Sequence, residues 1–113
     1  MVVREQKPKD LPSLFLLWQI HERQQNATAA REDLLDLVGR LGQFSENAMA
    51  SEPLLLRIAA LVRYANRELT RAEELLDRYA KLRPNDVGMR RLHGQVLLLL
   101  GEAKRAIATL ADL

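Results

Sequence analysis

The chain has 113 residues, with 48% hydrophobic, 4% aromatic and no cysteine, and its 17 Lys/Arg and 15 Asp/Glu leave a net charge of +2. Without cysteine there is no disulfide, no thiolate zinc site and no cysteine nucleophile. The small basic excess does not demand a nucleic-acid or membrane partner. No apolar run is longer than five residues, as in Leu14–Trp18 and Val96–Leu100, against about 20 for a membrane span.

The beginning of the chain, MVVREQKPKDLP, carries charges and two prolines where a signal peptide needs an apolar segment. We therefore expect a soluble, untargeted chain with no membrane partner. It would be cytoplasmic if complete, and periplasmic if it is a fragment of a longer scaffold.

The abundance of leucine and the spacing of apolar residues predict an all-α fold. Residues 1–9 are expected to form a flexible basic tail, and residues 10–113 a single domain. Six helices are predicted, over residues 11–25, 28–42, 53–66, 70–82, 87–101 and 102–113.

Several residues have the character of helix ends. Asp10 and Asp86 can each cap a following helix, and Pro12 and Pro53 suit first turns. The stretch Thr70–Glu73 has the spacing of a capping box. Apolar residues surround most of the 11–25 helix, so we expect it to be covered on more than one side, or to offer one face as an interface.

The chain repeats itself with an offset of 34 residues from Pro53 onward. Ala60 corresponds to Gly94, Ala72 to Ala106 and Leu76 to Leu110. Residues 12–45 form a degenerate copy with an offset of 41, and residues 46–52 then form a linker. A repeat of this length is typical of helical repeat arrays.

These positions resemble the tetratricopeptide repeat. The family has a small residue in the first helix (Ala60, Gly94), then an alanine (Ala72, Ala106) and a bulky residue (Leu76, Leu110) in the second, with a closing proline (Pro84). The physical reason is that two helices cross closely only where one lacks a large side chain. Residues 53–86 and 87–113 match well, whereas Gln19 and Arg31 depart from the pattern in the first copy.

The resemblance implies three hairpins stacked as a right-handed superhelix, whose first helices line a concave groove for a peptide or helix. The implied groove residues are Leu54, Arg57, Leu61, Tyr64, Ala65, Arg91, Gln95, Leu98 and Leu99, with Leu16, Ile20 and Arg23 from the first copy. Arg57 and Arg91 are 34 residues apart, and they would either hold a partner carboxylate or be ordinary solvated charges. A chaperone C-terminal clamp is not implied, because Leu61 and Gln95 replace its asparagines.

No catalytic, cofactor or metal site is expected. His21-Glu22 lacks the second histidine of a zinc-protease helix, and His93 is interpreted as a partly buried structural residue. The carboxylate clusters Glu32/Asp33/Asp36 and Glu73/Glu74/Asp77 are interpreted as solvated charge. The sequence thus does not indicate an enzyme.

The expected function is protein binding by a small adaptor, scaffold or chaperone, with homo- or hetero-oligomers through the terminal hairpins. In architecture the chain resembles small repeat chaperones of bacterial secretion systems. It is also similar to a segment of a longer scaffold of the kind used in bacterial polysaccharide export. Nucleic-acid binding is a weaker alternative, since the arginines lie on several helices without an aromatic platform.

Overall fold

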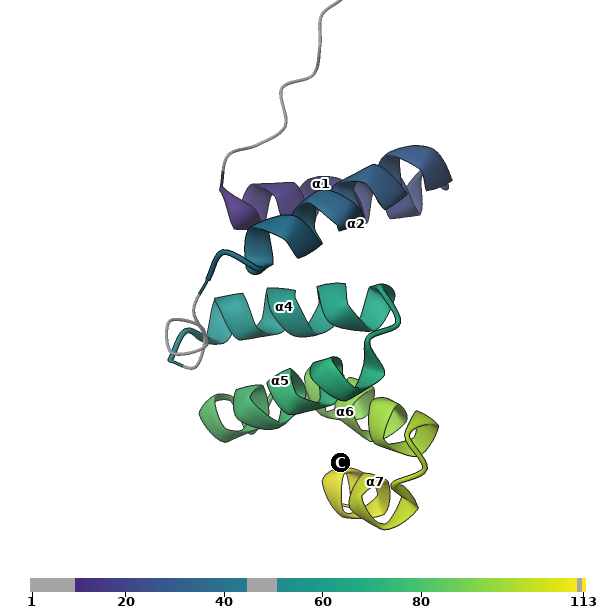
Figure 1. Cartoon of the computed structure of the whole chain (residues 1–113). Helices are drawn as coiled ribbons and strands as arrows, with labels where there is room; N and C mark the ends of the chain where they lie inside the picture. The colour runs from purple at the N-terminus through teal and green to yellow at the C-terminus, as the bar shows by residue number, and fades with distance from the viewer. Residues whose placement is uncertain (1–9, 45–50, 112) are drawn as a thin grey trace, which may run out of the picture. The chain divides into compact units, whose positions relative to one another are not determined.

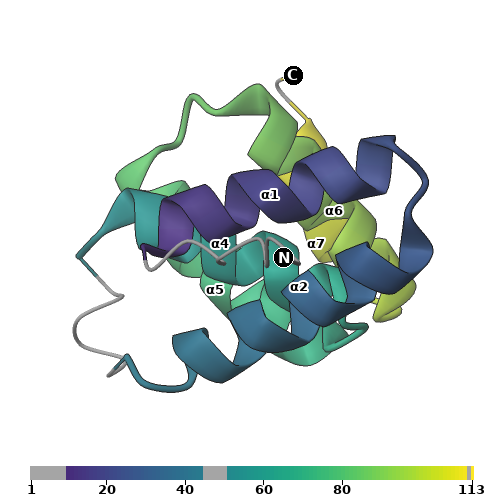
Figure 2. The same cartoon turned by 90° about the horizontal axis from the view of Figure 1, so that it is seen from above.

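The computed structural model describes residues 10–44, 51–111 and 113, and this part of the chain contains six helices and no strand. The predicted all-α class is therefore confirmed for these residues (Figures 1 and 2). The predicted tail at 1–9 and most of the predicted linker at 46–52 lie outside them. The helices are α1 (Leu11–Arg23), α2 (Ala27–Leu41), α4 (Pro53–Ala65), α5 (Leu69–Leu82), α6 (Val87–Leu99) and α7 (Ala103–Leu110).

The helices fall into two compact units. The first ends at Gln43 and contains the hairpin α1–α2, whereas the second begins at Phe44 and contains α4 to α7. Within the second unit α4 packs on α5, α5 on α6, and α6 on α7. A single domain over 10–113 and a right-handed superhelix stay predictions. No helix in the described residues is both long and apolar enough to cross a membrane.

Aspartates begin two of the helices, as predicted. The Asp10 carboxylate accepts a 2.9 Å hydrogen bond from the Ser13 amide at the start of α1. Asp86 does the same for the Met89 amide, at 3.2 Å, at the start of α6. Each side chain satisfies an amide that has no partner inside its helix.

The predicted capping box in α5 is wrong. The helix begins at Leu69 with Glu68 as its N-cap, so Thr70 lies inside the first turn. The Glu68 carboxylate makes no cap bond, because it accepts 3.0 Å hydrogen bonds from the side chains of Arg63 and Asn66. These bonds lower the pKa of Glu68, with Asn66 as the main cause. The hydrogen bonds of Glu68 with Arg63 and Asn66 therefore stabilise the α4–α5 turn.

The three hairpin turns are built alike. One residue in each turn has a positive φ: Gln25 at 56°, Arg67 at 61° and Gly101 at 81°. In each turn the amide of this residue binds the carbonyl three residues earlier, and the next amide binds the carbonyl five residues before itself. This pattern satisfies carbonyls at the end of the first helix. Arg67 and Gly101 are also 34 residues apart in the sequence.

The close approach between α6 and α7 occurs at Gly94. A β-carbon placed there would lie 2.7 to 2.8 Å from three carbon atoms of the Leu110 side chain. The corresponding residues of the preceding hairpin, Ala60, Ala72 and Leu76, are fully buried. The small residue and the bulky residue therefore meet at the crossing, as the packing argument requires.

Helix α1 buries one stripe, which corrects the prediction that it is covered on more than one side. Leu11, Leu14, Phe15 and Trp18 are buried. Leu16 and Ile20, on another face, are 57% and 43% exposed. The spacing of the buried residues is that of an ordinary amphipathic helix, and the remaining apolar residues form an exposed face.

The turn geometry predicts opposite effects for the same substitution at two glycines. Neither Gly101 nor Gly39, inside α2, has an atom near the added methyl group. Gly101→Ala should lower the free energy of unfolding by about 1 kcal/mol, because an L-residue is disfavoured at its positive φ. Gly39→Ala should raise it by about 0.5–1 kcal/mol, through lower chain entropy in the unfolded state. Urea unfolding measures the free energy of unfolding of both variants. Equal effects of the two substitutions would contradict the positive φ at Gly101.

The helix crossing predicts a cost for a larger side chain at Gly94. Gly94→Leu should lower the free energy of unfolding by about 1–3 kcal/mol, because Leu110 already fills the space. Gly39→Leu is the matched control, since the space beside Gly39 is open. If the two variants melt at the same temperature, the α6–α7 crossing is not where the structure places it.

Candidate functional site

The first helices of the two hairpins in the second unit meet through a polar contact. The Gln95 side chain on α6 donates a 3.2 Å hydrogen bond to the Tyr64 hydroxyl on α4. Both residues belong to the predicted groove. We use the term α4–α6 surface for the predicted groove residues of these two helices: Leu54, Arg57, Leu61, Tyr64, Ala65, Arg91, Gln95, Leu98 and Leu99.

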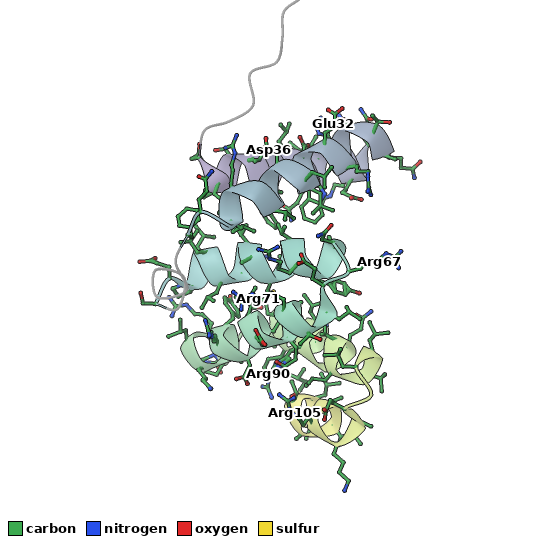
Figure 3. All side chains as sticks on the ribbon, viewed as in Figure 1. Glu32, Asp36, Arg67, Arg71, Arg90 and Arg105 are labelled. Atoms are coloured by element: carbon green, nitrogen blue, oxygen red, sulfur yellow. The ribbon has the colours of Figure 1, made fainter. Side chains whose placement is uncertain are left out.

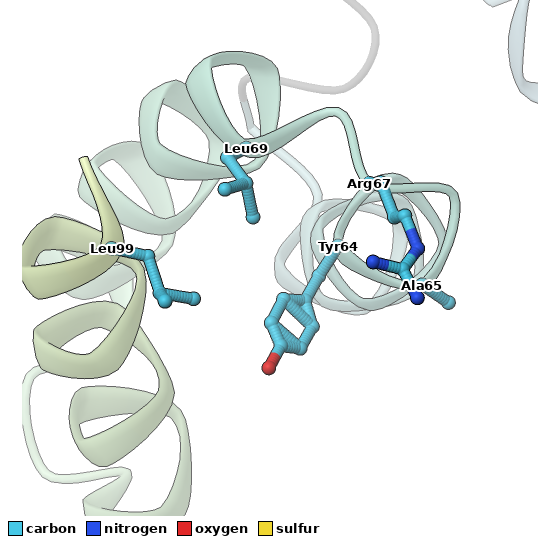
Figure 4. A pocket seen from close by; sticks show the side chains of 5 residues that line it. All are labelled: Tyr64, Ala65, Arg67, Leu69 and Leu99. Carbon is cyan, nitrogen blue, oxygen red and sulfur yellow. The ribbon is translucent and has the colours of Figure 1, made fainter.

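A pocket of about 400 Å³ lies at one end of the α4–α6 surface. Figure 4 shows the Tyr64 ring beside Leu99 of α6 and Leu69 of α5, while Ala65 and Arg67 complete the lining. The space between the three helices is thus lined by one aromatic and two leucine side chains. Tyrosine and leucine together provide apolar contact area with a polar group at the rim.

Large apolar side chains on this surface are exposed. Leu98 is 63% exposed, and Leu54 and Leu99 are more than half exposed. Leu61 and Tyr64 are half-buried. Several exposed apolar residues on neighbouring helices mark interaction surfaces more often than scattered ones do.

The structure gives Arg57 and Arg91 different surroundings. Arg57 lies close enough to Tyr79 and Asp86 to affect the pKa of both. Arg91 is exposed and makes no ion pair with any residue that the structure describes. Arg91 is therefore the better candidate for binding a carboxylate from outside, while Arg57 has an internal acidic neighbour.

Tyr79 and Asp86 connect the two hairpins. The Tyr79 hydroxyl donates a 2.6 Å hydrogen bond to one Asp86 oxygen, while the other oxygen caps α6. The bond from Tyr79 is the main cause of the lowered pKa of Asp86, and the Met89 amide and Arg57 contribute. Burial, followed by the bond to Asp86, raises the pKa of Tyr79. This contact holds α6 in place beside α5.

A second pocket, of about 420 Å³, opens between α6 and α7. We call its lining the end face, which consists of Arg91, Gly94, Gln95, Leu98, Ala103, Ala106, Ile107 and Leu110. The exposed fraction is 69% for Ile107 and 37% for Leu110. The end face shares Arg91, Gln95 and Leu98 with the α4–α6 surface, so α6 borders both.

Two carboxylates that were interpreted as solvated are buried, which corrects that prediction. Glu73 is 8% exposed and forms an ion pair with Arg105 of α7. Its carboxylate also lies 4.0 Å from the Nε2 atom of His93 on α6. Glu73 thus contacts both following helices. In the sequence Glu73 directly follows Ala72 and lies three residues before Leu76, on an apolar helix face. Both of these neighbours are buried.

Asp33 is the second buried carboxylate, with 1% exposure. It pairs with the Nδ1 atom of His21, which joins α2 to α1. The spacing of Ala30, Asp33 and Leu37 already placed Asp33 on the buried face of α2. Among the other members of the two clusters, Glu32 and Glu74 are exposed, and Asp36 and Asp77 are half-buried.

His93 is buried, as predicted, and neither ring nitrogen has a hydrogen-bond partner among the described residues. Burial is the main cause that lowers its pKa; Glu73 and Asp77 act in the opposite direction, and Arg105 lowers it further. A neutral imidazole therefore suits this site.

The remaining groove predictions, Leu16, Ile20 and Arg23, are exposed residues of the first unit. Among the described residues, no three His, Asp or Glu side chains form a group that could hold a metal ion. Figure 3 shows Arg67, at the α4–α5 turn, extending away from the helices. No family model matches the chain, and no curated protein or solved structure shows a significant match to it.

The buried imidazole predicts a pH dependence of stability. Because the pKa of His93 is lowered in the folded state, the unfolded chain binds a proton more readily than the folded chain near pH 6. The free energy of unfolding should therefore decrease as the pH falls below about 6.5. His93→Leu should reduce this decrease between about pH 7 and 5.

Urea unfolding of the parent chain and of the His93→Leu variant at several pH values measures the effect. His21 is present in both chains, so the difference between them isolates the contribution of His93. A variant with the same pH dependence as the parent would contradict the neutral, buried imidazole.

Proposed function

We propose that this chain is a protein-binding adaptor, scaffold or chaperone that holds a peptide or helix of its partner on the α4–α6 surface. The observation that carries the proposal is the Tyr64–Gln95 contact, which brings predicted groove residues of two helices together. Beside it lie a pocket of about 400 Å³ and exposed leucines. The proposed chemistry is binding without catalysis.

The composition of this surface suits a helix or an extended peptide. A bound helix buries a stripe of apolar side chains spaced by three and four residues. Leu54, Tyr64 and Leu99 offer apolar area for such a stripe. Tyrosine is also frequent among residues whose loss weakens protein complexes most.

The exposed arginine adds a preference for acidic partners. Arg91 lies on α6 and has no carboxylate partner in the described residues. A guanidinium can bind a carboxylate through two parallel hydrogen bonds. We therefore propose a partner segment with a carboxylate next to its apolar stripe.

The repeat resemblance supports the same proposal. The shared turn geometry of the three hairpins and the Gly94–Leu110 crossing agree with tetratricopeptide-like units. We propose that these units form a right-handed stack, either as a small free-standing chaperone or as a segment of a longer scaffold. We also propose that the chain acts in bacterial secretion or polysaccharide export.

Selection of binding peptides tests the proposal. A phage-displayed library of random linear peptides is selected on the full chain, and the enriched peptides are titrated against variants by fluorescence polarisation. Leu54→Asp combined with Leu99→Asp should weaken binding at least about tenfold, because both leucines are exposed and lie on the proposed surface. The melting temperature should remain unchanged.

Leu35→Asp is the control, since Leu35 is an equally exposed leucine on α2. Arg91→Ala should weaken acidic peptides selectively, whereas Arg57 is left intact because it lies near Asp86. Peptides that bind the parent and the double variant equally would contradict the proposal. Binding of mixed nucleic acid with a steep salt dependence would favour the alternative class.

A further inference from the structure

We propose that the chain associates head to tail, with the end face of one copy receiving α1 of a second copy. The end face is apolar and uncovered in the second unit, where Ile107 and Leu98 are 69% and 63% exposed. The end face shares Arg91, Gln95 and Leu98 with the α4–α6 surface, but the residues altered to test this proposal, Ile107 and Ile20, lie on α7 and α1.

The preceding hairpin shows what kind of element covers such a face. The residues 34 positions before the end face lie on α4 and α5. Helix α6 packs against α5 and hydrogen-bonds to α4 through Gln95 and Tyr64. The equivalent face is thus partly covered by one amphipathic helix, and Leu61 and Tyr64 on it are half-buried. The equivalent residues are Arg57, Ala60, Leu61, Tyr64, Leu69, Ala72, Glu73 and Leu76.

The preceding hairpin also indicates which charge a helix that covers the end face should carry. The N-cap of α6 is Asp86, which lies near Arg57. Arg91 occupies the position of Arg57 on the end face. A helix with an acidic N-cap would therefore place its carboxylate next to Arg91. Leu113 replaces Tyr79, so Arg91 is the group left to meet this carboxylate.

The central contact changes from polar to apolar. On the covered face, Glu73 lies 4.0 Å from His93, seven residues after the N-cap Asp86. On the end face Ile107 stands in place of Glu73. The matching helix should accordingly have an apolar residue seven positions after its acidic N-cap.

Helix α1 of this chain meets both requirements. Its N-cap is Asp10, and the residue seven positions later is Leu17. Leu16 and Ile20, on the same side, are 57% and 43% exposed. Ile20 lies ten residues after its cap, as does the buried Val96 of α6. In the proposed contact between two copies, Leu17 of α1 thus takes the place of His93, and Ile107 takes the place of Glu73.

Such a contact joins two different surfaces, and it can continue from copy to copy. Association of this kind forms rings or open chains rather than a two-fold dimer. It can therefore be distinguished from symmetric pairing by mixing two variants, each altered at one of the two surfaces.

The test uses the full chain and sedimentation velocity over a range of concentrations. The parent should form species larger than a monomer that grow with concentration. Ile107→Glu alters the end face, and Ile20→Glu alters α1; each variant alone should be monomeric up to at least about tenfold higher concentration. An equimolar mixture should form a one-to-one dimer, because one intact surface of each kind remains.

Leu54→Glu is the matched control, an exposed leucine on α4 that should leave association unchanged. Thermal melting verifies that each variant is folded, and Ile107→Lys and Ile20→Lys replace any glutamate variant that is not. Asp10→Asn keeps the helix cap and removes the charge. It and Arg91→Gln should each weaken association about two- to fivefold, and together no more than either alone.

Four results would overturn the proposal. They are a monomeric parent, self-association of Ile20→Glu alone, a mixture that stays monomeric, and loss of association in Leu54→Glu. The second result would indicate symmetric pairing through the end face. The first would leave the end face for a helix of another protein. The peptide titrations with Leu54→Asp and Leu99→Asp test the α4–α6 surface separately, because neither leucine belongs to the end face.

Discussion

The contact between α5 and α6 is the one on which the second unit depends. Within each hairpin, backbone hydrogen bonds of the turn connect the two helices, whereas a side-chain hydrogen bond also joins α5 to the start of α6. Here the Tyr79 hydroxyl binds the same Asp86 carboxylate that caps α6. The start of α6 is therefore defined by a residue of α5. The α4–α6 surface and the end face both depend on this placement of α6.

The buried Glu73 adds a second polar contact to this joint. Its carboxylate pairs with Arg105 of α7 and lies near His93 of α6. A buried charge is costly unless it is paired, so this group favours one arrangement of the three helices over alternatives. The His21–Asp33 pair plays the equivalent part between α1 and α2. In the described part of each unit, a buried carboxylate thus links helices.

The two exposed surfaces of α6 suit different kinds of binding. The α4–α6 surface combines exposed leucines with Tyr64 and an exposed arginine, which is the chemistry of peptide recognition. The end face is the uncovered equivalent of a face that α6 itself covers in the preceding hairpin. We therefore propose external partners for the first surface and a second copy of the chain for the other.

The sequence alone determined the helical class, the approximate helix bounds and the aspartate caps of α1 and α6. These features depend on local spacing, on a few side chains and on nearby amides, so tertiary contacts do not change them. Its spacing placed Asp33 and Glu73 on apolar helix faces, but their burial was not predicted, because their partners His21 and Arg105 lie on other helices. The capping box is wrong because α5 begins at Leu69, one residue before Thr70, and because Glu73 pairs with Arg105 of α7. Only the tertiary structure could show which partners these carboxylates have. It also showed that Arg57 and Arg91 have different surroundings, since Arg57 lies near Asp86 whereas Arg91 is exposed.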